Sequence, residues 1–126
     1  MRLFKTKWFM RYARQEKLED HNLCDAIERA ERGLVDADLG GGIIKQRVAR
    51  TGQGRSGGYR ILIAYRTGKR AVFLYGFAKS ERDIEADELE TLKEIGAVWL
   101  EVKKERLEYV IKEGILKEVI YEDRKR

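Results

Sequence analysis

The sequence predicts an α+β protein in which N-terminal helices pack on an antiparallel β-sheet and further helices follow at the C-terminal end. Two segments with helical spacing of apolar residues precede a central run of strand-like segments, and two more follow it. The strand-like segments are joined by glycine-containing turns, which is typical of an antiparallel meander. Proline is absent, so no helix is broken from within.

The N-terminal part is expected to hold one strand and two helices. A short strand over residues 2–7 leads into an amphipathic helix over 8–17. A second helix is expected over 20–32, with Asp20 as its N-cap and Gly33 at its end. The apolar stripe of this second helix is predicted to be Leu23, Ile27, Ala30 and Leu34.

Three strands are expected in the centre of the chain, over 43–49, 59–66 and 71–78. In the first of them Lys45 and Arg47 alternate with Ile44 and Val48, so the basic pair points to one side and the apolar pair to the other. A loop with four glycines in nine residues connects the first two strands.

A third helix is expected to begin after a cap at Ser80 or Asp83, and a fourth to cover 104–113. A last short strand is expected within 115–121. A chain of 126 residues supports a single domain. We expect this domain to cover 1–102, with 103–126 as a helical and strand extension of it.

The composition excludes several classes of site and protein. One cysteine, Cys24, excludes an internal disulfide and a cysteine-built metal site, and one histidine, His21, excludes a histidine cluster. No apolar run reaches the roughly 18 residues that a membrane helix needs. The start of the chain does not resemble a signal peptide. The expectation is a cytoplasmic protein that uses neither metal nor cofactor and does not contact membranes.

The basic residues are concentrated in the middle of the chain. The net charge is +5, yet the stretch from Leu39 to Ser80 holds no acidic residue. Its nine basic residues are Lys45, Arg47, Arg50, Arg55, Arg60, Arg66, Lys69, Arg70 and Lys79. Such a patch attracts polyanions, above all nucleic acid, although a merely solubilising surface is the alternative.

Four of these basic residues are expected to converge on one face of the sheet. Lys45 and Arg47 share one side of a strand, Arg60 opens the next strand and Lys79 closes the third. Converging cations can hold a phosphodiester and stabilise the charge that develops on its oxygens. In the glycine-rich loop, Arg50 and Arg55 can bring further positive charge to a phosphate. The loop is followed by a strand, so it is not a dinucleotide-binding turn.

Two separated motifs resemble one family. The first runs from Gly40-Gly41-Gly42-Ile43-Ile44-Lys45 through Gln46-Arg47-Val48-Ala49-Arg50 to Gly52-Gln53-Gly54-Arg55-Ser56-Gly57-Gly58-Tyr59-Arg60. The second is Phe77-Ala78-Lys79-Ser80-Glu81-Arg82. Their order and spacing are similar to those of RelE/HigB-like toxins of type II toxin–antitoxin modules, over about residues 3 to 100.

The resemblance implies a RelE-like fold and a ribosome-dependent endoribonuclease, or mRNA interferase, that cuts mRNA in the ribosomal A site without a metal. In such enzymes the RNA 2′-hydroxyl attacks the adjacent phosphate. The resemblance assigns Arg60 to the scissile phosphate and Lys79 to acid–base chemistry or phosphate contact, with Lys45 and Arg47 as basic partners. It also implies a helix-turn-helix antitoxin as partner. The basic stretch offers no histidine, and the general base is left unassigned.

Two other functions remain open at this stage. One is a ParE-like inhibitor of DNA gyrase, which shares the fold and has no need for convergent basic residues. The other is a nucleic-acid-binding module without catalysis. A small helix-turn-helix protein encoded by the neighbouring gene favours the toxin interpretations over the plain binding module.

Overall fold

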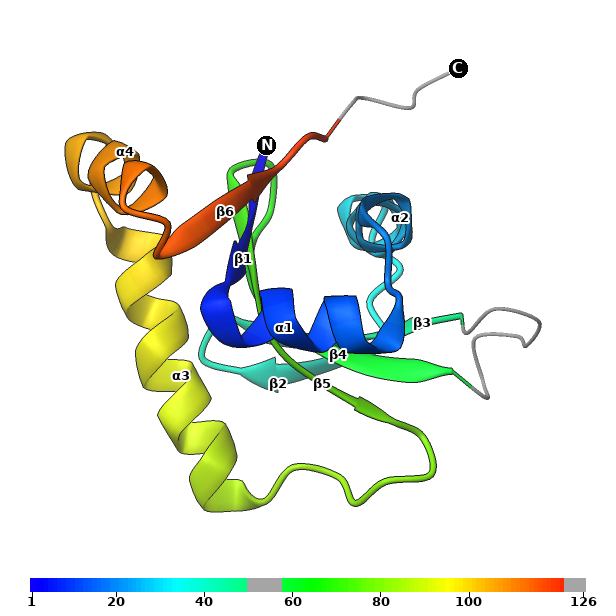
Figure 1. Cartoon of the computed structure of the whole chain (residues 1–126). Coiled ribbons are helices and arrows are strands. Elements are labelled where there is room, and N and C mark those ends of the chain that lie inside the picture. Colours follow the sequence, from blue (N-terminus) through cyan, green and yellow to red (C-terminus); the bar gives the residue numbers. More distant parts are fainter. Residues whose placement is uncertain (50–57, 122–126) are drawn as a thin grey trace.

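A six-stranded mixed β-sheet lies between two pairs of helices (Figure 1), as seen in a computed structural model that describes residues 1–49 and 58–121. The α+β class is therefore as expected. The strands are β1 (Arg2–Thr6), β2 (Ala37–Gly40), β3 (Ile43–Val48), β4 (Tyr59–Arg66), β5 (Arg70–Ala78) and β6 (Leu116–Val119). The helices are α1 (Lys7–Glu16), α2 (Asp20–Glu31), α3 (Ala86–Glu101) and α4 (Lys104–Lys112).

The sheet has the strand order β2-β3-β4-β5-β1-β6. All neighbouring pairs are antiparallel except β1 and β5, which run parallel. The expectation of a wholly antiparallel sheet was wrong at this pair. The meander β2 to β5 forms from neighbours in sequence, whereas β1 reaches β5 from the far end of the chain, a pairing that local patterns do not reveal.

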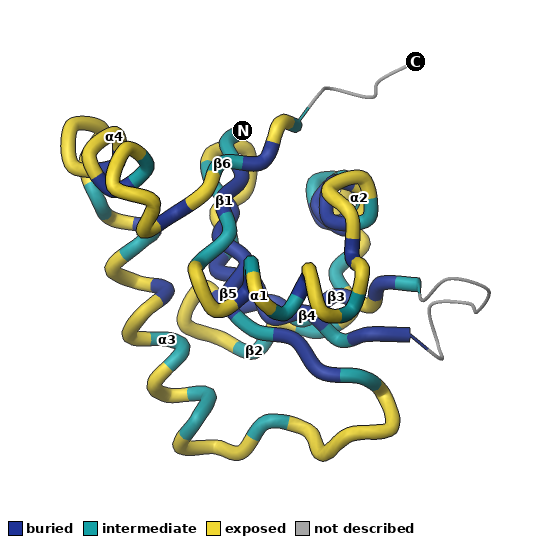
Figure 2. Tube along the Cα trace, in the orientation of Figure 1, coloured by how far each residue is buried: buried dark blue, intermediate teal, exposed yellow. Residues whose placement is uncertain are grey.

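Helices cover both faces of the sheet. On one face, Phe9, Leu23 and Ile27 of α1 and α2 pack with Ile61 and Phe73 of the sheet. On the other face, α3 and α4 pack against the strand residues whose side chains point away from the first cluster. This second cluster includes Leu100, Leu107, Val110, Ile43, Leu62, Ala64 and Val72. The central strands β4 and β5 are therefore buried along most of their length, as Figure 2 shows.

The helix starts differ from the expected caps. Thr6 caps α1 by accepting a hydrogen bond from the Phe9 N–H at 3.2 Å. Glu19, not Asp20, is the N-cap of α2, because its side chain and that of Asn22 form a reciprocal capping box. Glu85, rather than Ser80 or Asp83, caps α3 through the same kind of box with Glu88. Both boxes place a glutamate where serine, threonine and aspartate are the common choices.

Strand β2 was not foreseen, because its four residues combine an exposed aspartate with glycine. The turn after it has three successive left-handed residues, Gly40, Gly41 and Gly42, with φ of 82°, 59° and 82°. Glycine adopts such angles without the strain that a side chain brings. The turn thus returns the chain directly into β3. Leu34, expected in the stripe of α2, lies beyond the helix and is exposed.

In the described part of the chain, no helix has the length and apolar character required to span a membrane.

Candidate active site

The register of β3 and β4 places Arg47 directly opposite Arg60. Directly opposite residues in an antiparallel pair have Cβ atoms roughly 5 Å apart and project from the same face. Because side chains alternate, Lys45 projects from that face too, two residues earlier in β3. The face is the one covered elsewhere by α3 and α4, since Ile43 and Leu62 have the same alternation and pack in that core. The expected convergence of these three residues is therefore observed.

Helix α3 covers only one end of this face. It approaches the beginning of β3, where a Cβ added to Gly42 would lie 3.2 Å from Leu100 Cδ1. Arg47 and Arg60 lie at the other end of β3 and β4, and Figure 1 shows that this end of the two strands lies away from α3. Arg47 is exposed and Arg60 is half-buried. The two guanidinium groups therefore come from neighbouring strands at the end of the sheet that the helix leaves uncovered.

Lys45 is held by an acidic residue from the segment that follows β5. Its Nζ lies 3.3 Å from Asp83 Oδ2, and the lysine side chain is 24% exposed. The segment 79–85 thus passes close to the basic face before α3 begins. This ion pair places one carboxylate beside the cations.

A second carboxylate organises the backbone at Arg47. Asp36 Oδ2 accepts the Arg47 backbone N–H at 2.7 Å and an Arg29 N–H at 3.3 Å, and Arg29 also donates to the Arg47 carbonyl. Burial by itself would raise the pKa of Asp36, but the Arg47 N–H and the Arg29 guanidinium outweigh it and lower that pKa. Asp36 is therefore a carboxylate held in its charged form beside β3, at the backbone of Arg47.

Gln46 anchors the same strand from the opposite face. Its side chain is 0% exposed. Its amide donates to Ala26 O at 2.9 Å and to Leu34 O at 3.2 Å, and its oxygen accepts the Asp36 N–H at 2.7 Å. These bonds tie β3 to α2 and to the segment before β2. Sequence reasoning did not single out Gln46 or Asp36. Gln46 lies inside the first motif but was not assigned a role there, Asp36 lies outside both motifs, and the contacts of both exist only in the folded chain.

Lys79 follows the last residue of β5 and is exposed. Its backbone N–H donates to Gly58 O at 3.0 Å, while Phe77, two residues earlier, is paired with Arg60. Lys79 therefore lies at the same end of the sheet as Arg47 and Arg60. It does not begin a helix, because α3 starts only at Ala86. In the same segment, Glu81 accepts the Ala78 N–H at 2.6 Å.

Arg50 and Arg55, the expected substrate contacts of the glycine-rich loop, lie outside the described residues. Their contribution stays a prediction from the sequence.

The remaining basic residues of the central stretch lie elsewhere. Arg66, Lys69 and Arg70 are at the β4–β5 turn. Arg66 follows Arg60 by six positions in β4, which corresponds to roughly 20 Å. Arg66 contacts Glu101 at 2.6 Å, and Arg70 donates to the Trp99 and Val102 carbonyls. These arginines bind the C-terminal end of α3, where positive charge is favourable. The single positive field expected from the sequence is therefore divided between the two ends of the sheet.

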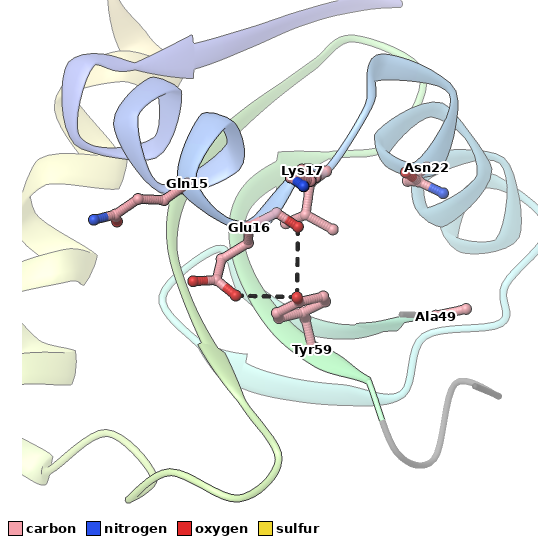
Figure 3. Close-up of a pocket in the computed structure, with 7 residues that line it drawn as sticks. Gln15, Glu16, Lys17, Asn22, Ala49 and Tyr59 are labelled. Atoms are coloured by element: carbon pink, nitrogen blue, oxygen red, sulfur yellow. Dashed lines mark hydrogen bonds between the residues drawn. The ribbon is translucent and has the colours of Figure 1, made fainter. Parts of the chain in front are cut away.

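A pocket opens at the end of α1, and its lining comes from α1, α2, β4 and the residue after β3. It has a volume of about 370 Å³, and Figure 3 shows the Tyr59 hydroxyl directed at Glu16. That hydroxyl donates to Glu16 Oε1 at 3.0 Å. Because Tyr59 and Arg60 are successive strand residues, they point to opposite faces. This pocket is therefore separate from the Arg47–Arg60 face.

Within the described residues, no group of three or more His, Cys, Asp or Glu side chains is placed to hold a metal ion. His21 is exposed, and Cys24 is buried with its thiol directed at the Ile120 carbonyl.

Comparison with known proteins assigns a family to this arrangement. The family model described as the RelE toxin of the RelE/RelB toxin–antitoxin system matches residues 1–119. The chain belongs to the RelE toxin family. No curated protein matches the sequence at the threshold of the comparison. The matched range includes every strand and helix of the described residues, so the resemblance noted in the two motifs extends over all of these elements. The members of this family are toxins of toxin–antitoxin systems, which implies an antitoxin as partner.

Proposed function

We propose that this RelE-family chain is a ribosome-dependent mRNA endoribonuclease that cuts by attack of the RNA 2′-hydroxyl. The observation that carries the proposal is the pairing of Arg47 with Arg60 across β3 and β4, on a face that Lys45 shares. Like charges directly opposite one another in a sheet are unfavourable. A pair kept despite this cost is typical of a site that binds an anion, and a phosphodiester is the anion that the toxin family suggests.

In the proposed reaction the 2′-oxygen of one nucleotide bonds to the phosphorus on its 3′ side, and the bond from phosphorus to the 5′-oxygen of the next nucleotide breaks. The 2′-hydroxyl gives up a proton and the leaving 5′-oxygen takes one. The products are a 2′,3′-cyclic phosphate and a free 5′-hydroxyl, so no water is consumed. What the protein must supply is charge stabilisation at the phosphate and proton transfer at the two oxygens.

The residues divide these tasks by their chemistry. Arg60 has a planar fork of donors that suits two phosphate oxygens, and we assign it to the scissile phosphate. Arg47, on the same face, neutralises charge beside it, and Lys45 positions the strand of RNA. Lys79 is exposed at the same end of the sheet, and its ammonium can donate a proton to the leaving oxygen. Arg50 and Arg55 add phosphate contacts from the loop.

The proposal also covers the substrate, the cellular location and the antitoxin. The substrate is mRNA in the ribosomal A site, within the cytoplasm. The antitoxin is a helix-turn-helix protein. The reaction proceeds on the charges of lysine and arginine side chains and draws on no cofactor.

The test is the chemistry of the cut. Purified protein is added to ribosomes stalled on a defined mRNA, and the product ends are analysed. We expect a 2′,3′-cyclic phosphate, and we expect an mRNA with one 2′-deoxynucleotide at the cleaved position to remain intact there. Cleavage of the 2′-deoxy substrate at the same bond would contradict the 2′-hydroxyl mechanism. Absence of cleavage by a folded protein that still arrests growth would favour a gyrase-directed toxin.

A further inference from the structure

A second pocket lies beside the basic face and is lined by aromatic rings. It has a volume of about 430 Å³ and is bounded by Trp8 and Tyr12 of α1, by Tyr75 and Phe77 of β5, and by Glu81 and Arg82 of the following segment. Among the described residues, β5 has no neighbouring strand on its outer side at this point, because the pairing with β1 ends at Phe73. The pocket therefore lies at an open edge of the sheet.

The rings of this pocket are arranged as stacked surfaces. The Trp8 ring lies 4.6 Å from that of Tyr75 and 5.2 Å from that of Tyr12, both in stacked orientation. Trp8 is 38% exposed, and large aromatic side chains seldom leave so much surface in water. Partly exposed aromatic side chains are the ones on which nucleic-acid bases stack.

Gly76 allows the rings to lie against the strand. A Cβ at this position would be 2.6 Å from Tyr12 Cε2 and 3.0 Å from Tyr12 Cδ2. Any side chain would therefore push Tyr12 away from β5.

The polar groups of the pocket favour a base over a phosphate. Glu16 and Glu81 contribute carboxylates, which accept N–H groups, while the guanidinium of Arg82 already contacts Glu85 at 3.2 Å and Glu88 at 3.7 Å. The Tyr12 hydroxyl is buried and has no hydrogen-bond partner within the described residues. Burial, with Glu16 and Glu81 nearby, raises the pKa of Tyr12, so the hydroxyl stays protonated as a donor. Carboxylate acceptors beside aromatic rings match the N–H groups at the edge of a nucleobase.

The pocket is also close to the proposed cleavage site. Phe77, one of its lining residues, is paired directly with Arg60. Neighbouring strands are about 4.8 Å apart, so one strand spacing separates the β4 backbone at Arg60 from the strand that lines the pocket.

We propose that this pocket binds one unstacked base of the substrate RNA, next to the cleaved linkage, and selects bases that present amino or imino N–H groups. The proposal rests on the proposed ribonuclease function. Trp8 supplies the stacking surface, and Glu81 accepts an N–H of the base. A surface for the antitoxin at Trp8 is the competing assignment, and the experiment below distinguishes the two.

The experiment measures single-turnover cleavage of a reporter mRNA with one randomised codon on stalled ribosomes, with the flanking bases read by sequencing. Base–aromatic stacking is worth enough that Trp8→Ala should slow cleavage about 5- to 100-fold, while Trp8→Phe should retain most of the rate. Trp8→Leu keeps apolar bulk without a ring and should behave as Trp8→Ala. Glu81→Gln preserves the acceptor for the Ala78 N–H and should flatten the preference among flanking bases.

Each outcome decides the matter. Slower cleavage by Trp8→Ala and Trp8→Leu, with an altered base distribution and intact neutralisation by the antitoxin, supports the base pocket. A wild-type rate and distribution in both variants overturns it, while cleavage by the wild-type protein upholds the proposed function. Wild-type cleavage combined with loss of neutralisation identifies the surface as an antitoxin contact and also overturns the proposal. Val98→Ala, at an exposed apolar residue of α3 outside the pocket, is the matched control and should leave all readouts unchanged.

Discussion

Gln46 precedes Arg47 in β3. Its side-chain amide is buried and takes part in three hydrogen bonds on the opposite face of the sheet. It links the Ala26 and Leu34 carbonyls to the Asp36 N–H. Asp36 in turn accepts the Arg47 N–H. A buried polar group of this kind is stabilising only while all its partners are present.

Replacing Gln46 by leucine should lower the free energy of unfolding by about 2–4 kcal/mol, because two carbonyls and one N–H lose their partner in the protein interior. Chemical denaturation measures the change. Gln15→Leu, at an exposed position of α1, serves as the control and should shift the stability by no more than about 0.5 kcal/mol. A Gln46→Leu protein as stable as the wild type would mean that the hydrogen bonds of Gln46 contribute little.

A substitution of Arg47 is expected not to lower the free energy of unfolding, in contrast to the substitution of Gln46. Its side chain faces Arg60 across the strands, and like charges directly opposite each other cost stability. Arg47→Gln should therefore leave the free energy of unfolding unchanged or raise it by up to about 1 kcal/mol at low salt, with the gain shrinking as salt is added. The same substitution should weaken RNA binding and reduce the salt dependence of binding by about one phosphate contact. A loss of stability together with unchanged RNA binding would show that Arg47 is structural.

At the scale of the elements, the C-terminal strand β6 is fastened to the N-terminal strand by a two-point ion pair. Arg2 Nε and Nη2 lie 2.8 Å from the two carboxylate oxygens of Glu118, and Nη2 also reaches Glu108 of α4 at 3.2 Å. The pKa of Glu118 is lowered, chiefly by the hydrogen bond from Arg2 and against the effect of burial. Arg2 of β1 thereby forms ion pairs with both α4 and β6, the last two elements of the chain.

The lowered pKa of Glu118 predicts a pH dependence. The folded state holds the carboxylate charged, so the contribution is fully present above the ordinary glutamate pKa of about 4.3 and is lost as the pH falls through the lower, folded value. Both side chains are about one-third exposed, which limits the gain to about 0.5–1 kcal/mol. Glu118→Gln should be less stable than the wild type by this amount at pH 7, and the difference should vanish in acid. A difference that persists at low pH would exclude the charge as its cause.

Most elements follow from the sequence because their periodicity is local. The helices over 8–17, 20–32 and 104–113 and the strands of the meander differ from the observed ones by one or two residues. Strand β2 and the parallel pair β1–β5 escaped prediction because one is too short to show alternation and the other joins distant segments. The cap of α3 escaped because Glu85 acts through a reciprocal bond with Glu88 that the residue types alone do not favour.

The candidate site, like the fold, was predicted only in part from the sequence. Alternation within one strand predicted the shared face of Lys45 and Arg47, and the strand boundaries predicted that Arg60 joins them. The carboxylates beside this face, Asp36 and Asp83, come from segments before β2 and after β5. Their approach depends on how the helices and connections pack, which sequence spacing does not encode.

At the scale of the whole molecule, the sheet separates two groups of basic residues with different contacts. The group at the β4–β5 turn binds the end of α3, with Arg66 on Glu101 and Arg70 on two carbonyls. The group at the other end lies on the face that α3 leaves uncovered, with Arg47 opposite Arg60. One charge-rich stretch of sequence thus serves the fold at one end of the sheet and, as we propose, the substrate at the other.

The most direct test of this account is single-turnover mRNA cleavage on stalled ribosomes by alanine variants at the two ends. Loss of a transition-state contact typically costs about 100-fold or more, so Arg60→Ala and Lys79→Ala should each lose activity to that extent. Arg66→Ala, the same substitution in the same strand, and Lys69→Ala, at the turn, should cut at nearly the wild-type rate once the variants are shown to be folded. Wild-type rates for both Arg60→Ala and Lys79→Ala, or equal losses at Arg66 and Lys69, would contradict the assignment of the active site.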